Sequence, residues 1–529
     1  MSNQFFETSK VVANDFLQSI VFVDDEAYAN KDEEHDLDVP SVTKVFAKSQ
    51  KICSIYNPLN ESDILDLIPI SKKADIVILD WKIDLQKKTL TKSEEETDEE
   101  KDDPRGLYTM QIIKGVLSNN NVGVNGLKMF VIYTGETNLW QITENIYNQL
   151  VHDVEGLQKN EFEVSAKNVK IVVIGKGSIR AKHINEIEAR IKSYEELPEF
   201  ILTEFTKMTS GLLSNTAIKA LTQIRKNSFK LIETFHPSID PAFLSHRALL
   251  PNPVDSEEHL LDIIGSEIKS ILKSCDLYSY ISKDDIRFYI EQNLEEKNYP
   301  FHIPYRKDFK TLVFPNEIDR NLLIKFTEVG IENLFFKRDT PSLERNLFSN
   351  NCYQSLTSYY SSNEDLAKES DKKFALLTSV KSNYNSRFSP LLTQGSIIKK
   401  ADNTYWLCIQ PKCDTNKIIK NREFLFVALK IREEISNFDF LLKIQDEYLY
   451  FKVNNNVYQS QFFNFKANAN QEVRGTFENT KILFKGNTNP PMEWVAELKS
   501  DFAQSISNQF ASNLSRVGMD HSEWLRRSS

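Results

Sequence analysis

Five short apolar runs, rich in valine and isoleucine, divide the first 180 residues of the chain. They lie at residues 20–24, 51–56, 74–80, 128–133 and 169–174. Because nearly every position in each run is apolar, both faces of these strands must be buried, which is typical of a parallel sheet covered by helices. Amphipathic stretches between the runs predict helices at 40–49, 61–69, 105–117 and 137–151. The pattern predicts a doubly wound α/β domain over residues 1–182, with a five-stranded parallel sheet.

The apolar spacing becomes helical after residue 183. Two sets of residues carry this spacing: Ile187, Ile191, Leu197, Ile201, Phe205, Met208 and Leu212, and then Leu260, Ile263, Ile268 and Leu272. Apolar residues three or four positions apart fall on one face of a helix. We therefore predict an α-helical domain over residues 183–360, and the polar residues 361–373 predict a linker after it.

Alternating runs rich in aromatic and β-branched residues follow the linker. They lie at residues 405–410, 423–429, 438–444, 447–453 and 481–485, with asparagine-rich turns between them. This pattern favours a small antiparallel sheet or barrel in a β-rich domain over residues 374–490. A helix at about 492–516 and a short tail are expected in the last segment, residues 491–529.

Composition narrows the possible environments and partners of the chain. Apolar residues make up 40% of it and charged residues 26%, and no segment has the roughly 18 to 20 apolar residues of a membrane span. The N-terminus lacks a basic segment followed by an apolar core, so we expect a cytoplasmic protein without a membrane partner. The five cysteines lack paired metal-site spacing and are expected to be free thiols: Cys53, Cys275, Cys352, Cys408 and Cys413.

The charge balance disfavours a nucleic-acid partner. The formal net charge is −10 and the sequence pI is about 5.5, so the chain as a whole repels a polyanion. Part of that charge comes from one acidic run at residues 93–103. We interpret this run as part of a solvated loop insertion at about 84–104.

Residue types suited to phosphoryl chemistry follow four of the five strands. Asp24 ends the first run and Asp25 follows it, Asp80 ends the third run, Thr134 follows the fourth, and Lys176 follows the fifth. Since the carboxyl ends of parallel strands meet at one edge of a sheet, these side chains should converge. A single acidic residue at a strand end is often only a helix cap or turn residue, but the joint order favours a functional site.

Each of these groups has a chemical role in moving a phosphoryl group onto a carboxylate. Asp80 would be the nucleophile that forms an acyl phosphate. Asp24 and Asp25 would bind Mg²⁺ together with Asp80, and the backbone carbonyl of Lys82 would be a further oxygen ligand. Lys176 would supply a positive charge to the phosphate.

Two small residues complete the expected site. Thr134 would donate its hydroxyl to a phosphoryl oxygen, and Gly135 would leave room beside the phosphoryl group.

Haloacid-dehalogenase-type phosphatases use a similar set of groups. However, their general acid stands two residues after the nucleophile, where this chain has Lys82, and their acidic pair comes last in the sequence.

The motifs VFVDDE, DIVILDW, VIYTGE and IVVIGKG resemble the four signature sites of response-regulator receivers, which have a flavodoxin/CheY-like fold. The resemblance implies that Asp80 is the phosphoacceptor, that Asp24 and Asp25 bind the metal, and that Thr134 and Lys176 contact the phosphate. Val173 stands where receivers commonly carry a switching aromatic residue, and Gly177 stands where they commonly carry proline. These departures weaken the expectation of an output switch.

A longer resemblance covers nearly the whole chain. Residues 235–251, 391–414 and 515–527 resemble parts of the divergent receiver proteins of Detocs-type anti-phage two-component systems. This implies a sensor histidine kinase as partner, an effector protein with its own receiver domain, and a phosphate-buffer role. The sequence has no P-loop, GxSxG or HExxH motif, so we expect no enzyme activity beyond accepting phosphate. The alternative is a response regulator whose β-rich domain is an output module that binds nucleic acid or a ligand.

Overall fold

The computed structural model describes most of the chain. The described residues are 4–28, 37–85, 105–118, 127–177, 187–250, 253, 255–275, 281–303, 306–352, 356–361, 363–383, 388–415, 418–433, 438–454, 456–486 and 490–514. The predicted acidic insertion therefore lies almost entirely outside them. The chain divides into two compact units, Met1–Glu295 and Glu296–Ser529.

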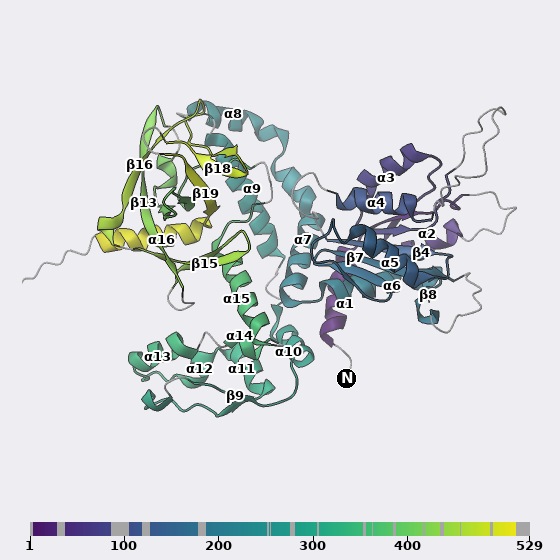
Figure 1. Cartoon of the computed structure of the whole chain (residues 1–529), viewed down its shortest axis with the longest axis horizontal. Helices are drawn as coiled ribbons and strands as arrows, with labels where there is room; N and C mark the ends of the chain where they lie inside the picture. The colour runs from purple at the N-terminus through teal and green to yellow at the C-terminus, as the bar shows by residue number, and fades with distance from the viewer. Residues whose placement is uncertain are drawn as a thin grey trace, which may run out of the picture. The chain divides into compact units, whose positions relative to one another are not determined.

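An eight-stranded sheet forms the centre of the first unit (Figure 1). Its strand order is β2-β1-β3-β4-β7-β6-β5, and β8 pairs with β7. All pairs from β2 to β7 along this order are parallel, and so is the β7–β8 pair. The bounds are β1 Ser19–Val23, β2 Ile52–Tyr56, β3 Ile76–Leu79, β4 Lys128–Thr134, β5 Gln158–Lys159, β6 Glu163–Ala166, β7 Val169–Lys176 and β8 Ile191–Lys192.

The five predicted strands are thus all present and parallel, but the predicted strand number is wrong. Strands β6 and β5 add an antiparallel hairpin beyond β7. Strand β8 pairs with the last two residues of β7. These additional strands have two to four residues and include polar positions, so they carry no continuous apolar signal. Ile191, which we expected in a helix, lies in β8.

Helices cover both faces of the sheet. Their bounds in this unit are α1 Gln4–Phe16, α2 Val39–Lys48, α3 Glu61–Lys73, α4 Leu107–Leu117, α5 Leu139–Leu150, α6 Leu197–Thr209, α7 Leu212–Thr234, α8 Asp240–Leu249, α9 Asp255–Ser274 and α10 Lys283–Asn293. Alternate strand residues enter two separate cores. One core contains side chains from α3, α4 and α5, and the other contains side chains from α1, α2 and α6. This double burial explains why the central strands are mostly apolar on both faces.

Side-chain caps fix where two of these helices begin. The Asp38 carboxylate accepts a hydrogen bond from the backbone N–H of Ser41 at the start of α2. Asn60 and Asp63 form a reciprocal capping box at the start of α3. Such caps satisfy backbone N–H groups that have no partner within the helix.

A buried carboxylate, Asp75, connects α7 to the edge of the sheet where β1 and β3 begin. Asp75 accepts hydrogen bonds from the backbone N–H groups of Gln18 and Ser19 at 2.9 and 3.1 Å. The guanidinium of Arg225, on α7, lies 3.1 Å from the other Asp75 oxygen and stacks 4.4 Å from the ring centre of Phe16. This contact holds α7 against α1 and the amino end of β1.

The second unit contains a helical part and a nine-stranded antiparallel sheet. The helices are α11 Arg320–Val329, α12 Ile331–Phe335, α13 Ser342–Cys352, α14 Leu356–Tyr359, α15 Glu364–Ser379 and α16 Ser500–Leu514. The sheet has the order β14-β15-β13-β12-β11-β19-β18-β17, with β16 on β13. Its strands are β11 Ser396–Lys399, β12 Tyr405–Cys408, β13 Asn421–Arg432, β14 Phe440–Ile444, β15 Glu447–Val453, β16 Gln461–Lys466, β17 Thr476–Glu478, β18 Lys481–Phe484 and β19 Met492–Glu497; a separate pair is β9 Tyr299–Pro300 with β10 Glu317–Ile318.

The antiparallel β-rich prediction is confirmed, with two local corrections. Helix α15 occupies most of the predicted linker, because Asn363 caps it by accepting a hydrogen bond from the N–H of Leu366. The helix predicted from residue 492 begins only at Ser500, because Met492–Glu497 form β19 and pair with β11 and β18.

Two further expectations can be compared with the described residues. None of the described helices is both long and apolar enough to cross a membrane. The four cysteines whose side chains are described, Cys53, Cys275, Cys408 and Cys413, are free thiols.

One glycine in the first unit is required by both conformation and space. Gly106 precedes α4 with φ +79°, and a Cβ there would overlap the ring of Trp81. We predict that Gly106→Ala lowers the free energy of unfolding by about 2 to 4 kcal/mol, since it adds a steric clash to left-handed backbone strain. The measurement is urea-dependent hydrogen exchange of β3 and β4.

Gly156 provides the matched control for this prediction. Its φ is +71°, but an added Cβ would meet no atom within 4 Å. Gly156→Ala should therefore cost only the conformational strain, about 1 to 2 kcal/mol. Equal losses for the two variants would show that the contact between Gly106 and Trp81 is unimportant.

Candidate functional site

The site lies where the central strands of the first unit end. Asp24 directly follows β1 and Asp80 directly follows β3, whose last residues, Val23 and Leu79, are register partners. Thr134 ends β4 opposite Gly175 of β7. Because β3 lies between β1 and β4, and β7 follows β4, the predicted residues reach one edge of the sheet.

Three carboxylates cluster at this edge. One oxygen from each of Asp24, Asp25 and Asp80 can be chosen so that all three lie within 4.8 Å of one another. Asp24 is completely buried, Asp80 is 6% exposed and Asp25 is half-buried. Among the residues that the structure describes, no other group of three or more potential metal ligands lies this close together. Hard oxygen donors of this kind suit Mg²⁺.

Lys176 is inserted between two of these carboxylates. Its Nζ donates hydrogen bonds to Asp80 Oδ2 at 2.7 Å and to Asp24 Oδ2 at 3.0 Å. The lysine is only 2% exposed. Burial by itself lowers the pKa of Lys176, but the charges and hydrogen bonds of Asp80 and Asp24 outweigh burial and raise it. Lys176 is therefore a fixed positive charge beside Asp80.

Two of the three carboxylates, Asp25 and Asp80, hold protons more tightly than usual. Burial, reinforced by the charges of Asp24 and Asp25, raises the pKa of Asp80 to about 7 although Lys176 opposes the shift. Burial also raises the pKa of Asp25 to about 6, against the hydrogen bond from Asp84. A divalent cation would oppose both shifts, since a nearby positive charge stabilises the ionised carboxylates.

Backbone N–H groups orient the carboxylates. The N–H of Glu26 donates to Asp24 Oδ1 at 2.9 Å, and the N–H of Asp84 donates to Asp25 Oδ2 at 2.8 Å. Since these donors belong to the loops after β1 and β3, the two loops hold the acidic cluster in place together.

Thr109 is a site residue that the sequence did not reveal. Its buried hydroxyl donates to the carbonyl oxygens of Asp80 at 2.5 Å and Trp81 at 3.2 Å. This contact holds the backbone at Asp80 and Trp81 against the first turn of α4. Thr109 comes 29 residues after Asp80, and a threonine in a helix has no distinguishing sequence signal.

Thr134, Gly135 and Lys82, the remaining predicted site residues, lie at the same edge of the sheet. The side chains of Thr134 and Lys82 form no hydrogen bond with the Asp80 carboxylate. Thr134 is buried, and its Oγ1 accepts a hydrogen bond from the N–H of Glu136 at 3.2 Å. Gly135 is exposed. The N–H of Lys82 lies 3.4 Å from Asp80 Oδ1, and its side chain pairs with Asp84. The phosphate contact of Thr134 and the metal contact of the Lys82 carbonyl stay predictions.

The region after Lys176 also departs from the expected pattern in a specific way. Strand β8 pairs with Gly175 and Lys176, and Tyr133 donates a hydrogen bond to the carbonyl of Lys192 at 2.8 Å. A Cβ on Gly177 would lie 3.4 Å from the Ser193 backbone. The short strand β8 and the residue after it thus lie close to Gly177, the position where receivers commonly carry proline.

Comparison with known proteins gives one match. Neither the curated proteins nor the solved structures contain a match to this chain. A protein-family model described as a response receiver domain matches residues 16–181, which contain β1 to β7 and the whole carboxylate cluster. This match supports a receiver family for the N-terminal part of the chain, and it indicates a phosphoacceptor role in two-component signalling.

Proposed function

We propose that this protein takes a phosphoryl group from a sensor histidine kinase onto Asp80 in the presence of Mg²⁺. The observation that carries the proposal is the position of Lys176 between Asp80 and Asp24, within a cluster of three carboxylates. A lysine whose Nζ bonds the nucleophile can also contact the phosphoryl oxygens that arrive there.

The proposed reaction moves one phosphoryl group between two proteins. A carboxylate oxygen of Asp80 attacks the phosphorus of the donor phosphohistidine; a P–O bond forms, the P–N bond breaks, and the departing imidazole takes up a proton. Bound Mg²⁺ would supply positive charge that offsets the repulsion between the anions. Asp24 and Asp25 would hold the cation with Asp80, and Lys176 would stabilise charge on the phosphoryl group.

Within a signalling system, we assign the chain the role of a regulator or phosphate buffer in bacterial anti-phage defence. The support is the sequence resemblance over residues 235–251, 391–414 and 515–527 and the absence of an effector motif from the sequence. A buffer needs only to accept phosphate and release it, without catalysing a further reaction. The kinase would then have a second target, an effector protein with its own receiver domain.

The alternative of a β-rich output module that stacks nucleic-acid bases has less support. Three aromatic side chains of the β-rich domain, Tyr405, Trp406 and Phe451, are 5%, 7% and 0% exposed and belong to the cores of the second unit. Base stacking needs exposed ring faces. Tyr448 and Tyr450 are half-buried, and Tyr448 donates a hydrogen bond to Glu369.

Removal of the nucleophile tests the proposal directly. We predict that Asp80→Asn lowers ³²P transfer from an autophosphorylated kinase by about 100-fold or more, because an amide cannot form the acyl phosphate. Asp84→Asn is the matched control, since this carboxylate is exposed and pairs with Lys82. Equal labelling of wild type and Asp80→Asn would show that Asp80 is not the phosphoacceptor.

The acidic cluster also predicts a pH-dependent response to Mg²⁺. The pKa values of Asp25 and Asp80 are raised to about 6 and about 7, so their contribution to the stability of the metal-free protein is full below about pH 4 and is lost as the pH rises through 6 to 7. Mg²⁺ binds the deprotonated carboxylates. The increase in melting temperature on adding Mg²⁺ should therefore be larger at about pH 8 than at about pH 5.5.

The double variant Asp25→Asn/Asp80→Asn is the control for the Mg²⁺ response. It removes both titrating ligands and should lose most of the stabilisation at either pH. Differential scanning fluorimetry with and without Mg²⁺ measures the effect. A stabilisation of the wild type that is equal at the two pH values, or larger at the lower one, would contradict the proposed metal ligands.

A further inference from the structure

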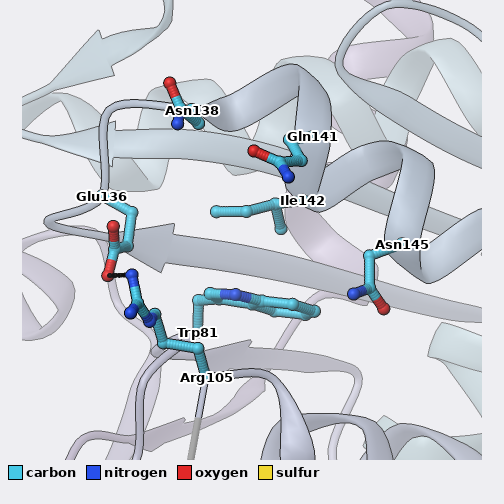
Figure 2. Close-up of a pocket in the computed structure, with 7 residues that line it drawn as sticks. All are labelled: Trp81, Arg105, Glu136, Asn138, Gln141, Ile142 and Asn145. Carbon is cyan, nitrogen blue, oxygen red and sulfur yellow. Dashed lines mark ion pairs between the residues drawn. The ribbon is translucent and has the colours of Figure 1, made fainter. Parts of the chain in front are cut away.

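A polar hollow of about 260 Å³ is lined partly by the loops that follow β3 and β4. Trp81, the residue after Asp80, forms part of its lining, and Glu136, two residues after Thr134, forms another part. Figure 2 shows Gln141 and Ile142 above the Trp81 ring, with Glu136 near one end of the hollow. A molecule that occupied it would lie beside the loops that carry Asp80 and Thr134.

The hollow offers hydrogen-bonding groups in a regular row. Asn138, Gln141 and Asn145 follow one another at intervals of three and four residues, which places them along one side of α5 and of its N-cap. The side-chain amides of Asn138 and Gln141 form no hydrogen bond to any residue that the structure describes. Asn145 Oδ1 accepts a hydrogen bond from Gln149, which leaves the Asn145 NH₂ group able to donate.

One end of the hollow carries a weak ion pair. Arg105 NH1 lies 3.9 Å from Glu136 Oε1, beyond hydrogen-bond distance, and both side chains are partly exposed (Figure 2). An ion pair this exposed contributes little to stability, so charged groups of a ligand can compete with it. An incoming segment with charged groups could pair with either residue.

The spacing of the amides matches an extended polypeptide. Seven residues of helix separate Asn138 from Asn145, a rise of about 10 Å, which is the length of about three residues of extended chain. Carboxamides both donate and accept, as peptide groups do. A nucleic-acid base fits less well, because Trp81 is only 4% exposed and has no free ring face for stacking.

From this geometry we infer that the hollow is a docking subsite for an extended segment of the phosphodonor protein. The inference rests on the proposed function of Asp80, whose phosphodonor must approach the same edge of the sheet. The amide row would bind the main chain of the donor segment, while Arg105 and Glu136 would select its charged side chains. The hollow would thus set which donor protein is accepted, without taking part in the chemical step.

The test compares a protein donor with a small one. Gln141→Ala/Asn145→Ala removes two exposed amides from helix positions where alanine favours the helix, so the fold is retained. The histidine kinases of the source organism, autophosphorylated with [γ-³²P]ATP, serve as protein donors, and acetyl phosphate is the small donor. Asn148→Ala, also exposed on α5 but outside the hollow, is the matched control.

We expect the double variant to accept phosphate from its best kinase about tenfold more slowly, with labelling by acetyl phosphate within about twofold of the wild type. The Asn148→Ala control should match the wild type with both donors. Unchanged transfer from the kinase, or an equal slowing with both donors, would overturn the docking role. A wild-type protein that neither donor labels would instead overturn the proposed function of Asp80, and the docking role with it.

Discussion

The buried contact between Lys176 and the carboxylates of Asp24 and Asp80 is the interaction on which the rest of the site depends. Three ionised carboxylates and one lysine leave a net charge of −2 in a place almost closed to water. Burying unbalanced charge is costly, and the raised pKa values of Asp25 and Asp80 are the consequence. The arrangement is balanced only when protons or a divalent cation are added. The same feature that destabilises the metal-free site therefore gives it affinity for a cation.

The sequence could predict the central sheet because its strands are buried on both faces. When helices flank an apolar run such as residues 74–80, the run is interpreted as a strand buried on both faces. Because the strands are parallel, Asp24, Asp80 and Lys176 then lie at one edge of the sheet. Contacts that depend on loop conformation could not be predicted in this way. The hydrogen bonds from Thr109 to the peptide carbonyls after β3, and from the N–H of Asp84 to Asp25, arise from loop geometry with no periodic signal.

The second unit shows the same principle and its limits. Strand β13 places Phe424 and Phe426 in one core and Val427 and Leu429 in another, so residues 424–429 are all apolar and the strand was easy to recognise. Helix α15 was mistaken for a linker because it is largely exposed and has few apolar residues. Its start depends on the Asn363 cap, which composition alone does not reveal. Exposed helices therefore need capping signals for their recognition, whereas buried strands do not.

The hairpin beyond β7 has a consequence for how the chain avoids unwanted association. A parallel sheet that ended at β7 would offer eight residues of unpaired backbone to a strand from another molecule. Strand β6 covers four of these residues, and the sheet then ends in β5, which has two exposed residues. One of them, Lys159, is held by an ion pair with Glu144. This flank of the sheet is thus protected against edge-to-edge aggregation.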